Sequence, residues 1–354
     1  MKRHGFYLIF FLAVAYYGFQ FFNQKSFFLE TPYGSTVIHE PVLIELIHSK
    51  AMQRLKKVNQ YGVVHFIRPH QNYTRYEHSL GVLFLLRKFG ATLEEQVVGL
   101  LHDVSHTAFS HVADFLFESI LDKLSYQDKI SDWYIEQTDI LPILKKYNCV
   151  DTCLIENRDK HIMLKKNLPS LCADRLEYNL YGGYLEGWLT KKELKNIVEH
   201  IRYCDCEWCF DDVNVARKFG YVSINLSRDI WCSAWNGFVC KRTAHLLKHA
   251  FDLQLFTHDD FVFSVDEHLW DILNNSSNPL VVELLQKIKE YKTSYILGSK
   301  NEHDLYIRGK FRGVDPLIVT EQGLTALSVL DSEFKSYFND SKQYCDKGRY
   351  IKYL

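Results

Sequence analysis

The chain has 354 residues, of which 47% are hydrophobic and 24% are charged, a composition that excludes a disordered protein and allows one large domain or two smaller ones. The formal net charge of −1 gives no overall positive field, so we do not expect a nucleic-acid polymer as a partner. Nine cysteines, an odd number without a repeating spacing, do not indicate a small module held together by disulfides.

The first 24 residues contain a segment that predicts targeting or anchoring. Lys2 and Arg3 precede an uncharged apolar run over residues 6–22, which is short for a membrane-spanning helix and suits the core of a signal peptide. We therefore expect residues 1–24 to be a cleaved signal peptide or an uncleaved membrane anchor; a first core helix is the alternative. Positive charge before the run favours export or membrane association of the rest of the chain, with a cytoplasmic location as the alternative.

Helical patterning dominates the residues that follow. Apolar residues recur at helical spacing over residues 41–58, and a short extended stretch is expected over residues 63–67. A helix over residues 77–89 should end at Gly90, where a left-handed cap fits glycine. Thr92 and Glu95 then predict a capping box that begins a second helix, which runs through residue 101.

The short turn between these two helices places ligand-type side chains together. Helices joined so tightly lie side by side, which lets His78 face His102 and Asp103. Imidazole nitrogens and carboxylate oxygens are donors to divalent transition metals, and an aspartate buried beside two histidines is costly without a cation. The sequence therefore predicts a metal site, although a single histidine on an apolar helix is more often a hydrogen-bonded core residue.

Three motifs in this order resemble a known family. The segments TRYEHSLGV, HDVSHTAFSHVAD and CADRLEYN are similar to those of the HD-domain metal-dependent phosphohydrolases, in particular the branch that contains the deoxynucleoside triphosphate triphosphohydrolases. The resemblance implies a mainly α-helical fold. It comprises an HD-type metal-binding helical bundle over residues 34–190, a helical C-terminal extension over residues 191–354 packed on the same core, and short β segments.

The resemblance also implies roles for individual residues. The implied ligands of one divalent transition metal (Mn, Fe, Ni or Zn) are His78, His102, Asp103 and Asp174. Residues implied to hold phosphate, polarise the leaving oxygen or orient the attacking water are Arg75, His106, His111 and Asp114. Arg175 and Tyr178 are candidates for phosphate and sugar contacts. Arg54 and Gln60 are possible substrate contacts, although a surface salt bridge or a helix cap explains them equally well.

We expect hydrolysis of a phosphorylated small molecule, a (deoxy)nucleoside triphosphate first and a phosphomonoester second, by a chain that forms a homo-oligomer. Two departures from the family pattern favour a non-catalytic metal- and nucleotide-binding protein as the alternative. Ser131 stands where relatives carry a helper histidine, and Gly182 stands where triphosphohydrolases carry an acidic residue for the sugar hydroxyl.

Two further groups of metal-ligand residues stand apart from these motifs. Cys204, Cys206 and Cys209 could bind zinc or form a disulfide, but no second pair lies at finger-like spacing, so unlinked structural thiols are the simpler interpretation. His245 and His249 are one helical turn apart without a carboxylate beside them in sequence, which favours a solvated or partner-facing helix over a second metal site.

Overall fold

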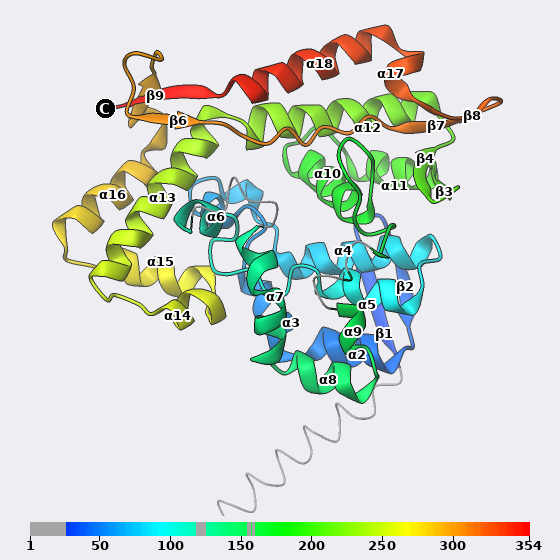
Figure 1. Ribbon diagram of the computed structural model, residues 1–354, viewed down its shortest axis with the longest axis horizontal. Helices are drawn as coiled ribbons and strands as arrows, with labels where there is room; N and C mark the ends of the chain where they lie inside the picture. Colours follow the sequence, from blue (N-terminus) through cyan, green and yellow to red (C-terminus); the bar gives the residue numbers. More distant parts are fainter. Residues whose placement is uncertain (1–25, 118–124, 154–156, 158–159) are drawn as a thin grey trace, which may run out of the picture.

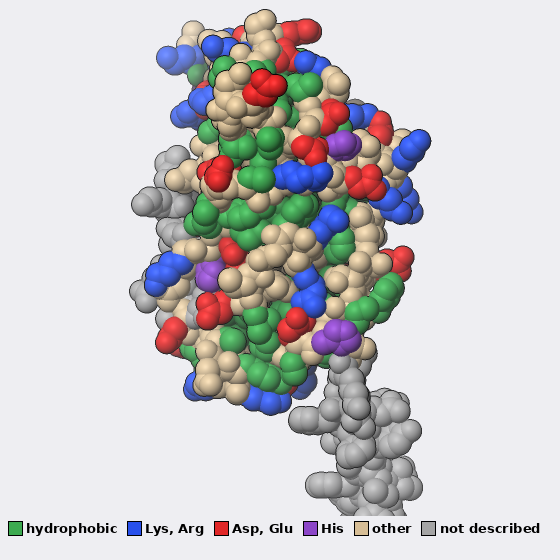
Figure 2. All heavy atoms as spheres, turned by 90° about the vertical axis from the view of Figure 1, so that its right-hand side faces the viewer, with side chains coloured by type: hydrophobic (Ala, Val, Ile, Leu, Met, Phe, Trp, Pro, Cys, Tyr) green, Lys and Arg blue, Asp and Glu red, His purple; other side chains and the backbone are tan. Residues whose placement is uncertain are grey.

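The computed structural model describes residues 26–117, 125–153, 157 and 160–354, and the predicted segment 1–24 lies outside them. Helices make up most of the described chain and the sheets are small (Figure 1), which confirms the mainly α fold. Within the described ranges, no helix is both long and apolar enough to cross a membrane. Acidic and basic side chains intermingle over the face shown in Figure 2, as the balanced net charge leads us to expect.

The described chain begins with an antiparallel hairpin and a series of short helical turns. Strands β1 (Phe27–Thr31) and β2 (Gly34–Ile38) pair along their whole length. They are followed by α2 (Pro41–His48), α3 (Lys50–Arg54) and the 3₁₀ turns η1 (Leu55–Lys57), η2 (Gly62–Phe66) and η3 (Pro69–Gln71).

The expected single helix over residues 41–58 is therefore wrong. It is broken at Ser49, whose extended backbone and side-chain oxygen cap the next helix through the Met52 amide at 3.3 Å. The stretch expected to be extended over residues 63–67 is also wrong, because it lies mostly in η2.

Two adjacent helices carry the central motifs. Helix α4 (Arg75–Lys88) starts at a complete capping box between Thr74 and Glu77, and Gly90 follows it with a φ of 81°. Helix α5 (Leu93–Leu101) is capped by Thr92, but the predicted reciprocal bond from Glu95 is absent. The Glu95 carboxylate is buried and accepts the Met163 amide at 2.8 Å instead, so a tertiary contact has replaced the local one.

The rest of the first half consists of short helices and one longer helix. These are α6 (Val112–Leu116), α7 (Tyr126–Glu136), α8 (Ile140–Lys146), α9 (Val150–Cys153) and α10 (Ala173–Leu185). Helix α10 packs closely on α4 at Gly81. A Cβ atom added at this glycine would lie 2.4 Å from Glu177 Oε1.

The second half adds helices and two small sheets. The helices are α11 (Lys191–Glu199), α12 (Val213–Asn225), α13 (Ala234–Asp252), α14 (His258–Phe263), α15 (Asp266–Asn274), α16 (Pro279–Lys289), α17 (Leu327–Leu330) and α18 (Ser332–Lys347), with a π-helix η6 (Leu226–Trp231) after α12 and a 3₁₀ turn η7 (Tyr291–Thr293). One sheet has the order β3 (Ile201–Cys204), β4 (Glu207–Phe210), β7 (Leu317–Thr320), β8 (Gly323–Ala326), and the other β5 (Tyr295–Leu297), β9 (Arg349–Tyr353), β6 (Leu305–Ile307).

Both halves contribute to both hydrophobic clusters. One cluster joins residues of α2, α4 and α5 to residues of α12 and α18, such as Phe219 and Phe334, which are fully buried. The other joins Phe109 and Val112 to α13, α15 and α16. The chain from β6 to β7 runs along α12 toward the sheet below α18 (Figure 1).

Candidate metal centre

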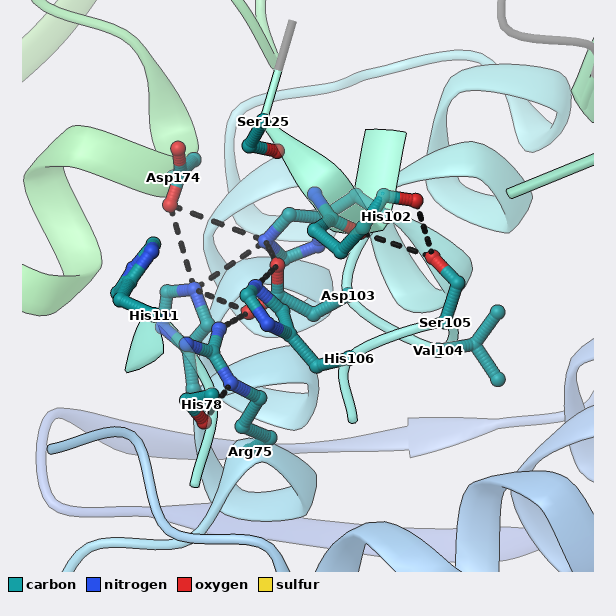
Figure 3. A network of polar contacts seen from close by, with 12 residues as sticks. Arg75, His78, His102, Asp103, Val104, Ser105, His106, His111, Ser125 and Asp174 are labelled. Atoms are coloured by element: carbon teal, nitrogen blue, oxygen red, sulfur yellow. Dashed lines mark hydrogen bonds and ion pairs between the residues drawn. The ribbon is translucent and has the colours of Figure 1, made fainter. Parts of the chain in front are cut away.

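Three helices bring the four predicted metal ligands to one place. His78 lies in the first turns of α4, His102 caps the C-terminus of α5 with Asp103 next to it, and Asp174 lies in the first turn of α10. Asp174 Oδ1 is 3.2 Å from His78 Nε2 and 3.7 Å from His102 Nε2. Asp103 Oδ2 is 3.7 Å from His78 Nε2 (Figure 3). The structure thus gathers all four side chains, and Asp174 is the most exposed of them at 35%.

The hydrogen bonds of the two imidazoles fix which nitrogen faces the cluster. His102 Nδ1 donates to the Gly99 carbonyl at 2.7 Å, and His78 Nδ1 donates to the Glu177 carboxylate. In the neutral rings, both Nε2 atoms therefore present lone pairs, and they face each other at 3.2 Å. Such an arrangement is repulsive unless a proton or a metal ion lies between the nitrogens, so this donor set fits a cation.

The charges around His78 support the same conclusion. Burial lowers the pKa of His78, but the carboxylates of Glu177, Asp174 and Asp103 outweigh it and raise the pKa to about 10. The surrounding carboxylates therefore favour a positive charge at this ring. A divalent ion would replace that proton, as metal binding to histidine does in general.

Asp103 is paired with a buried arginine. The Arg75 guanidinium forms an ion pair with Asp103 Oδ2, and its Nε donates to Ser110 Oγ at 2.8 Å. Burial opposes ionisation of Asp103, but Arg75 and the neighbouring histidines hold the pKa of its carboxyl well below the usual range. Arg75 is only 1% exposed, and its second terminal nitrogen is buried without a hydrogen-bond partner among the described residues. The structure thus places Arg75 behind the metal ligand, and its contact with phosphate stays a prediction.

Two further histidines and an aspartate lie on one side of the cluster. His106 Nε2 is 3.4 Å from Asp103 Oδ1, and burial together with the Arg75 charge lowers the pKa of His106 to about 3. His111 is half exposed, and its Nδ1 is 3.2 Å from Asp114 Oδ2. The rings of His111 and His106 lie edge-on, with their centroids 5.2 Å apart. Burial opposes ionisation of Asp114, but its bond to His111 contributes to lowering the pKa to about 2. His111 is therefore the solvent-facing member of this group.

Glu177 contacts the predicted metal ligand His78, and the sequence analysis missed it. Its carboxylate is fully buried and accepts hydrogen bonds from His78 and from the hydroxyl groups of Tyr33 and Tyr73. It orients the His78 ring and fixes its tautomer, as residues behind metal-binding histidines do. The sequence did contain a signal for this contact: Glu177 follows the predicted ligand Asp174 by three residues, so the two side chains are neighbours on the same helix.

Asp266 was missed as well. It lies at the start of α15 in the second half, is fully buried, and accepts the amides of Asn59 and Phe109, both at 2.8 Å. Phe109 and Ser110 have φ values of 59° and 50°, a left-handed conformation that non-glycine residues adopt only when their surroundings enforce it. Asp266 therefore holds the loop between His106 and His111 in its strained shape.

The residues predicted to contact the substrate outside the metal cluster form hydrogen bonds and ring contacts within the protein. Arg175 donates to the carbonyl oxygens of Ser170 and Lys166, and the Tyr178 ring meets Trp231 edge-on at 5.3 Å. Their roles toward phosphate and sugar stay predictions. Arg54 donates to the carbonyl oxygens of Val104, His106 and Ser264, which makes it a support of the site loop in this structure.

The two departures from the family pattern lie on helices next to the site. Ser131 is fully buried on α7. At Gly182 on α10, an added Cβ would lie 3.0 Å from the Tyr61 hydroxyl oxygen.

Gln60 has a buried side-chain oxygen without a hydrogen-bond partner among the described residues, so the amide retains a free acceptor.

Elsewhere in the described chain, no second group of three candidate ligands lies within metal-binding distance. All nine cysteines are free thiols, so the predicted alternative of a disulfide among Cys204, Cys206 and Cys209 is not formed. Within the described residues, His245 and His249 belong to no such group of three.

Comparison with known proteins decides the family. The family model of the HD domain matches residues 75–146. YdhJ of Bacillus subtilis, an uncharacterised protein, is 32% identical over 88% of this chain and 95% of its own length. The metal-dependent phosphohydrolase cns2 of Cordyceps militaris is 30% identical over 73% of this chain and 76% of its own length. The chain belongs to the HD-domain metal-dependent phosphohydrolases.

Two more distant likenesses complete the comparison. A deoxynucleoside triphosphate triphosphohydrolase SAMHD1 homologue of Dictyostelium discoideum is 26% identical over 48% of this chain and 38% of its own length. The fold matches the crystal structure of a phosphohydrolase from Bacteroides thetaiotaomicron with a TM-score of 0.67 at 15% identity, over 93% of this chain and all of the other. The predicted family is thereby confirmed, and its HD domains bind divalent metals.

Proposed function

We propose that this HD-domain protein hydrolyses a nucleotide, a nucleoside triphosphate or deoxynucleoside triphosphate first, with one divalent metal ion bound by His78, His102, Asp103 and Asp174. The observation that carries the proposal is the pair of facing Nε2 atoms bordered by two carboxylates. A bound divalent ion lowers the pKa of water and stabilises charge on phosphoryl oxygens. Nitrogen and oxygen donors of this kind suit Mn, Fe, Ni or Zn.

The other residues of the site would support the reaction in different ways. Arg75 compensates the charge of Asp103 and keeps that ligand ionised. His111, which is half exposed and hydrogen-bonded to Asp114, can exchange a proton with water or with the leaving oxygen. His106 is buried and neutral at pH 7, so it would serve as a neutral hydrogen-bonding partner within the site.

The choice of a triphosphate rests on the family relationship, because a relative that shares about half of this chain is named for that substrate. Two alternatives remain distinct from it. A phosphomonoesterase would release orthophosphate from nucleoside monophosphates, and a non-catalytic protein would bind metal and nucleotide without turnover.

Metal analysis combined with a substrate panel tests the proposal. Protein loaded with Mn, Fe, Ni or Zn is incubated with nucleoside triphosphates, deoxynucleoside triphosphates and monophosphates, and the products are separated into orthophosphate and tripolyphosphate. Asp174→Ala should lose metal and activity together. It is preferable to Asp103→Ala, because breaking that buried pair would leave the Arg75 charge unpaired at a cost of about 3–5 kcal/mol.

His161→Ala is the matched control, since His161 is a buried histidine that is not one of the four proposed ligands. It should retain metal and activity. Full metal occupancy in Asp174→Ala would refute the assignment of Asp174 as a ligand. Metal-loaded protein that cleaves neither triphosphates nor monophosphates would establish the non-catalytic alternative.

A further inference from the structure

The hydroxyl group of Ser110 joins the buried arginine of the metal centre to a backbone carbonyl of another segment. Ser110 Oγ is 2.6 Å from the Asn59 carbonyl oxygen and 2.8 Å from Arg75 Nε. The carbonyl can only accept and Nε can only donate, so the hydroxyl proton points to Asn59 and a lone pair of Oγ accepts Arg75. Ser110 is 1% exposed, so both bonds are shielded from bulk solvent.

Arg75 depends on this hydroxyl for its orientation. Within the described chain, its side chain has two hydrogen-bond partners, Ser110 Oγ at Nε and the Asp103 carboxylate at Nη1 (Figure 3). The guanidinium is planar, so two contacts at different nitrogens fix its plane. Without the Ser110 hydroxyl, the predicted metal ligand Asp103 would be the only group left to hold the arginine.

Ser110 is itself held by the second half of the chain. Asp266, at the start of α15, accepts the Phe109 amide with Oδ1 and the Asn59 amide with Oδ2, both at 2.8 Å. Phe109 directly precedes Ser110, and Asn59 supplies the carbonyl that the Ser110 hydroxyl binds. One carboxylate therefore fixes the backbone on both sides of this hydroxyl. A continuous chain of contacts runs from α15 to the Arg75 guanidinium.

We propose that Ser110 is a positioning residue of the metal centre, which holds the Arg75 guanidinium against Asp103 and connects that ligand to the second half of the chain. This inference rests on the proposed function, in which Asp103 binds the metal. Loss of an outer partner of a metal ligand typically weakens metal binding by about 10–100-fold. Ser110 acts through Arg75 rather than on the ligand itself, so we expect about 10-fold, the lower end of this range.

Two substitutions at residue 110 separate positioning from loop stability. Ser110→Ala and Ser110→Gly both remove the hydroxyl, but the φ of 50° at this residue is strained for alanine and relaxed for glycine. If Ser110 only stabilised the loop, glycine would compensate for the loss and bind metal like the wild type. If the hydroxyl positions Arg75, both variants bind Zn²⁺ and Mn²⁺ about 10-fold more weakly in competition with a chelator of known affinity.

Ser223→Ala is the matched control. Ser223 is fully buried, and its hydroxyl also donates to one backbone carbonyl and accepts one N–H group. These partners are the Gly220 oxygen at 2.8 Å and the Val314 amide at 3.0 Å. We expect Ser223→Ala to lower the stability against urea while its metal affinity stays at the wild-type level. A loss of metal affinity equal to that of the Ser110 variants would overturn the proposal.

Asp266→Asn tests the connection to the second half. An amide side chain accepts through its oxygen only, so it loses at least one of the two backbone contacts. In the double variant with Ser110→Ala, the loss of metal affinity should be close to the larger of the two single losses, because both changes break the same chain of contacts. Single losses that multiply in the double variant would overturn the connection through Ser110.

The metal-affinity measurements distinguish this inference from the proposed function. Wild-type metal affinity in Ser110→Gly would overturn the positioning role even if the protein hydrolyses nucleotides. Weaker metal binding in both Ser110 variants, with Ser223→Ala unchanged, would support the role even if the metal-loaded wild type shows no turnover.

Discussion

Glu177 should control the metal affinity although it does not touch the metal. Glu177→Gln keeps the shape of the side chain but removes its charge. Glu177 Oε1 accepts both tyrosine hydroxyls and Oε2 accepts His78 Nδ1, so an amide must either turn its NH₂ group toward His78 or present it to the tyrosines. In the first case Nδ1 becomes the acceptor, and the proton moves to the Nε2 atom that should bind metal.

The magnitude follows from this geometry. Loss of a carboxylate behind a metal-binding histidine weakens metal binding by about 10–100-fold, which corresponds to about 1.4–2.8 kcal/mol. Gly81→Ala should act in the same direction, because its Cβ would lie 2.4 Å from Glu177 Oε1 and push the carboxylate away.

Competition with a chelator of known affinity measures the dissociation constant of each metal-loaded variant. Glu186→Gln is the matched control, since Glu186 follows the same helix and bonds to Arg68 and Gln71, away from the metal ligands. Metal affinity equal to that of the wild type in Glu177→Gln would refute the role assigned to this carboxylate.

Three further predictions concern other parts of the chain. Burial raises the pKa of Asp266 to about 7. Its favourable contribution to folding is therefore complete below about pH 4, the range of an ordinary aspartate, and is lost as the pH rises through 7. Urea unfolding from pH 5 to 8 should show a steeper fall in stability for the wild type than for Asp266→Asn, and equal slopes would contradict this. His111→Ala should lower turnover by about 10²–10⁴-fold with metal content unchanged, and loss of metal would instead make His111 a ligand. A reporter fused after residue 30 should leave the cytoplasm, and deletion of residues 1–24 should yield a soluble folded protein; a reporter retained in the cytosol would refute the export prediction.

Local patterns predicted the elements that depend on local chemistry. The apolar periodicity, Thr92 and Gly90 were sufficient for α4, α5 and the turn between them, and that turn was sufficient to bring His78 toward His102 and Asp103. Asp174 required the family resemblance, because it lies 71 positions after Asp103 and its motif alone indicates only a charged residue at a helix start.

Residues whose role depends on distant partners could not be predicted in this way. Glu177 meets His78 across 99 positions, and Asp266 meets Phe109 across 157. The same effect explains the error at Glu95, where the distant Met163 amide replaces the local cap.

The position of Asp266 in the sequence has a consequence for the order in which the protein is made. The ligands His78, His102, Asp103 and Asp174 leave the ribosome well before it, yet the loop between His106 and His111 is fixed by the Asp266 carboxylate. Domains in general begin to fold from the N-terminus during synthesis. For this chain, we expect the metal centre to reach its final shape only after α15 has emerged, so metal captured by the nascent chain would enter a site that is still incomplete.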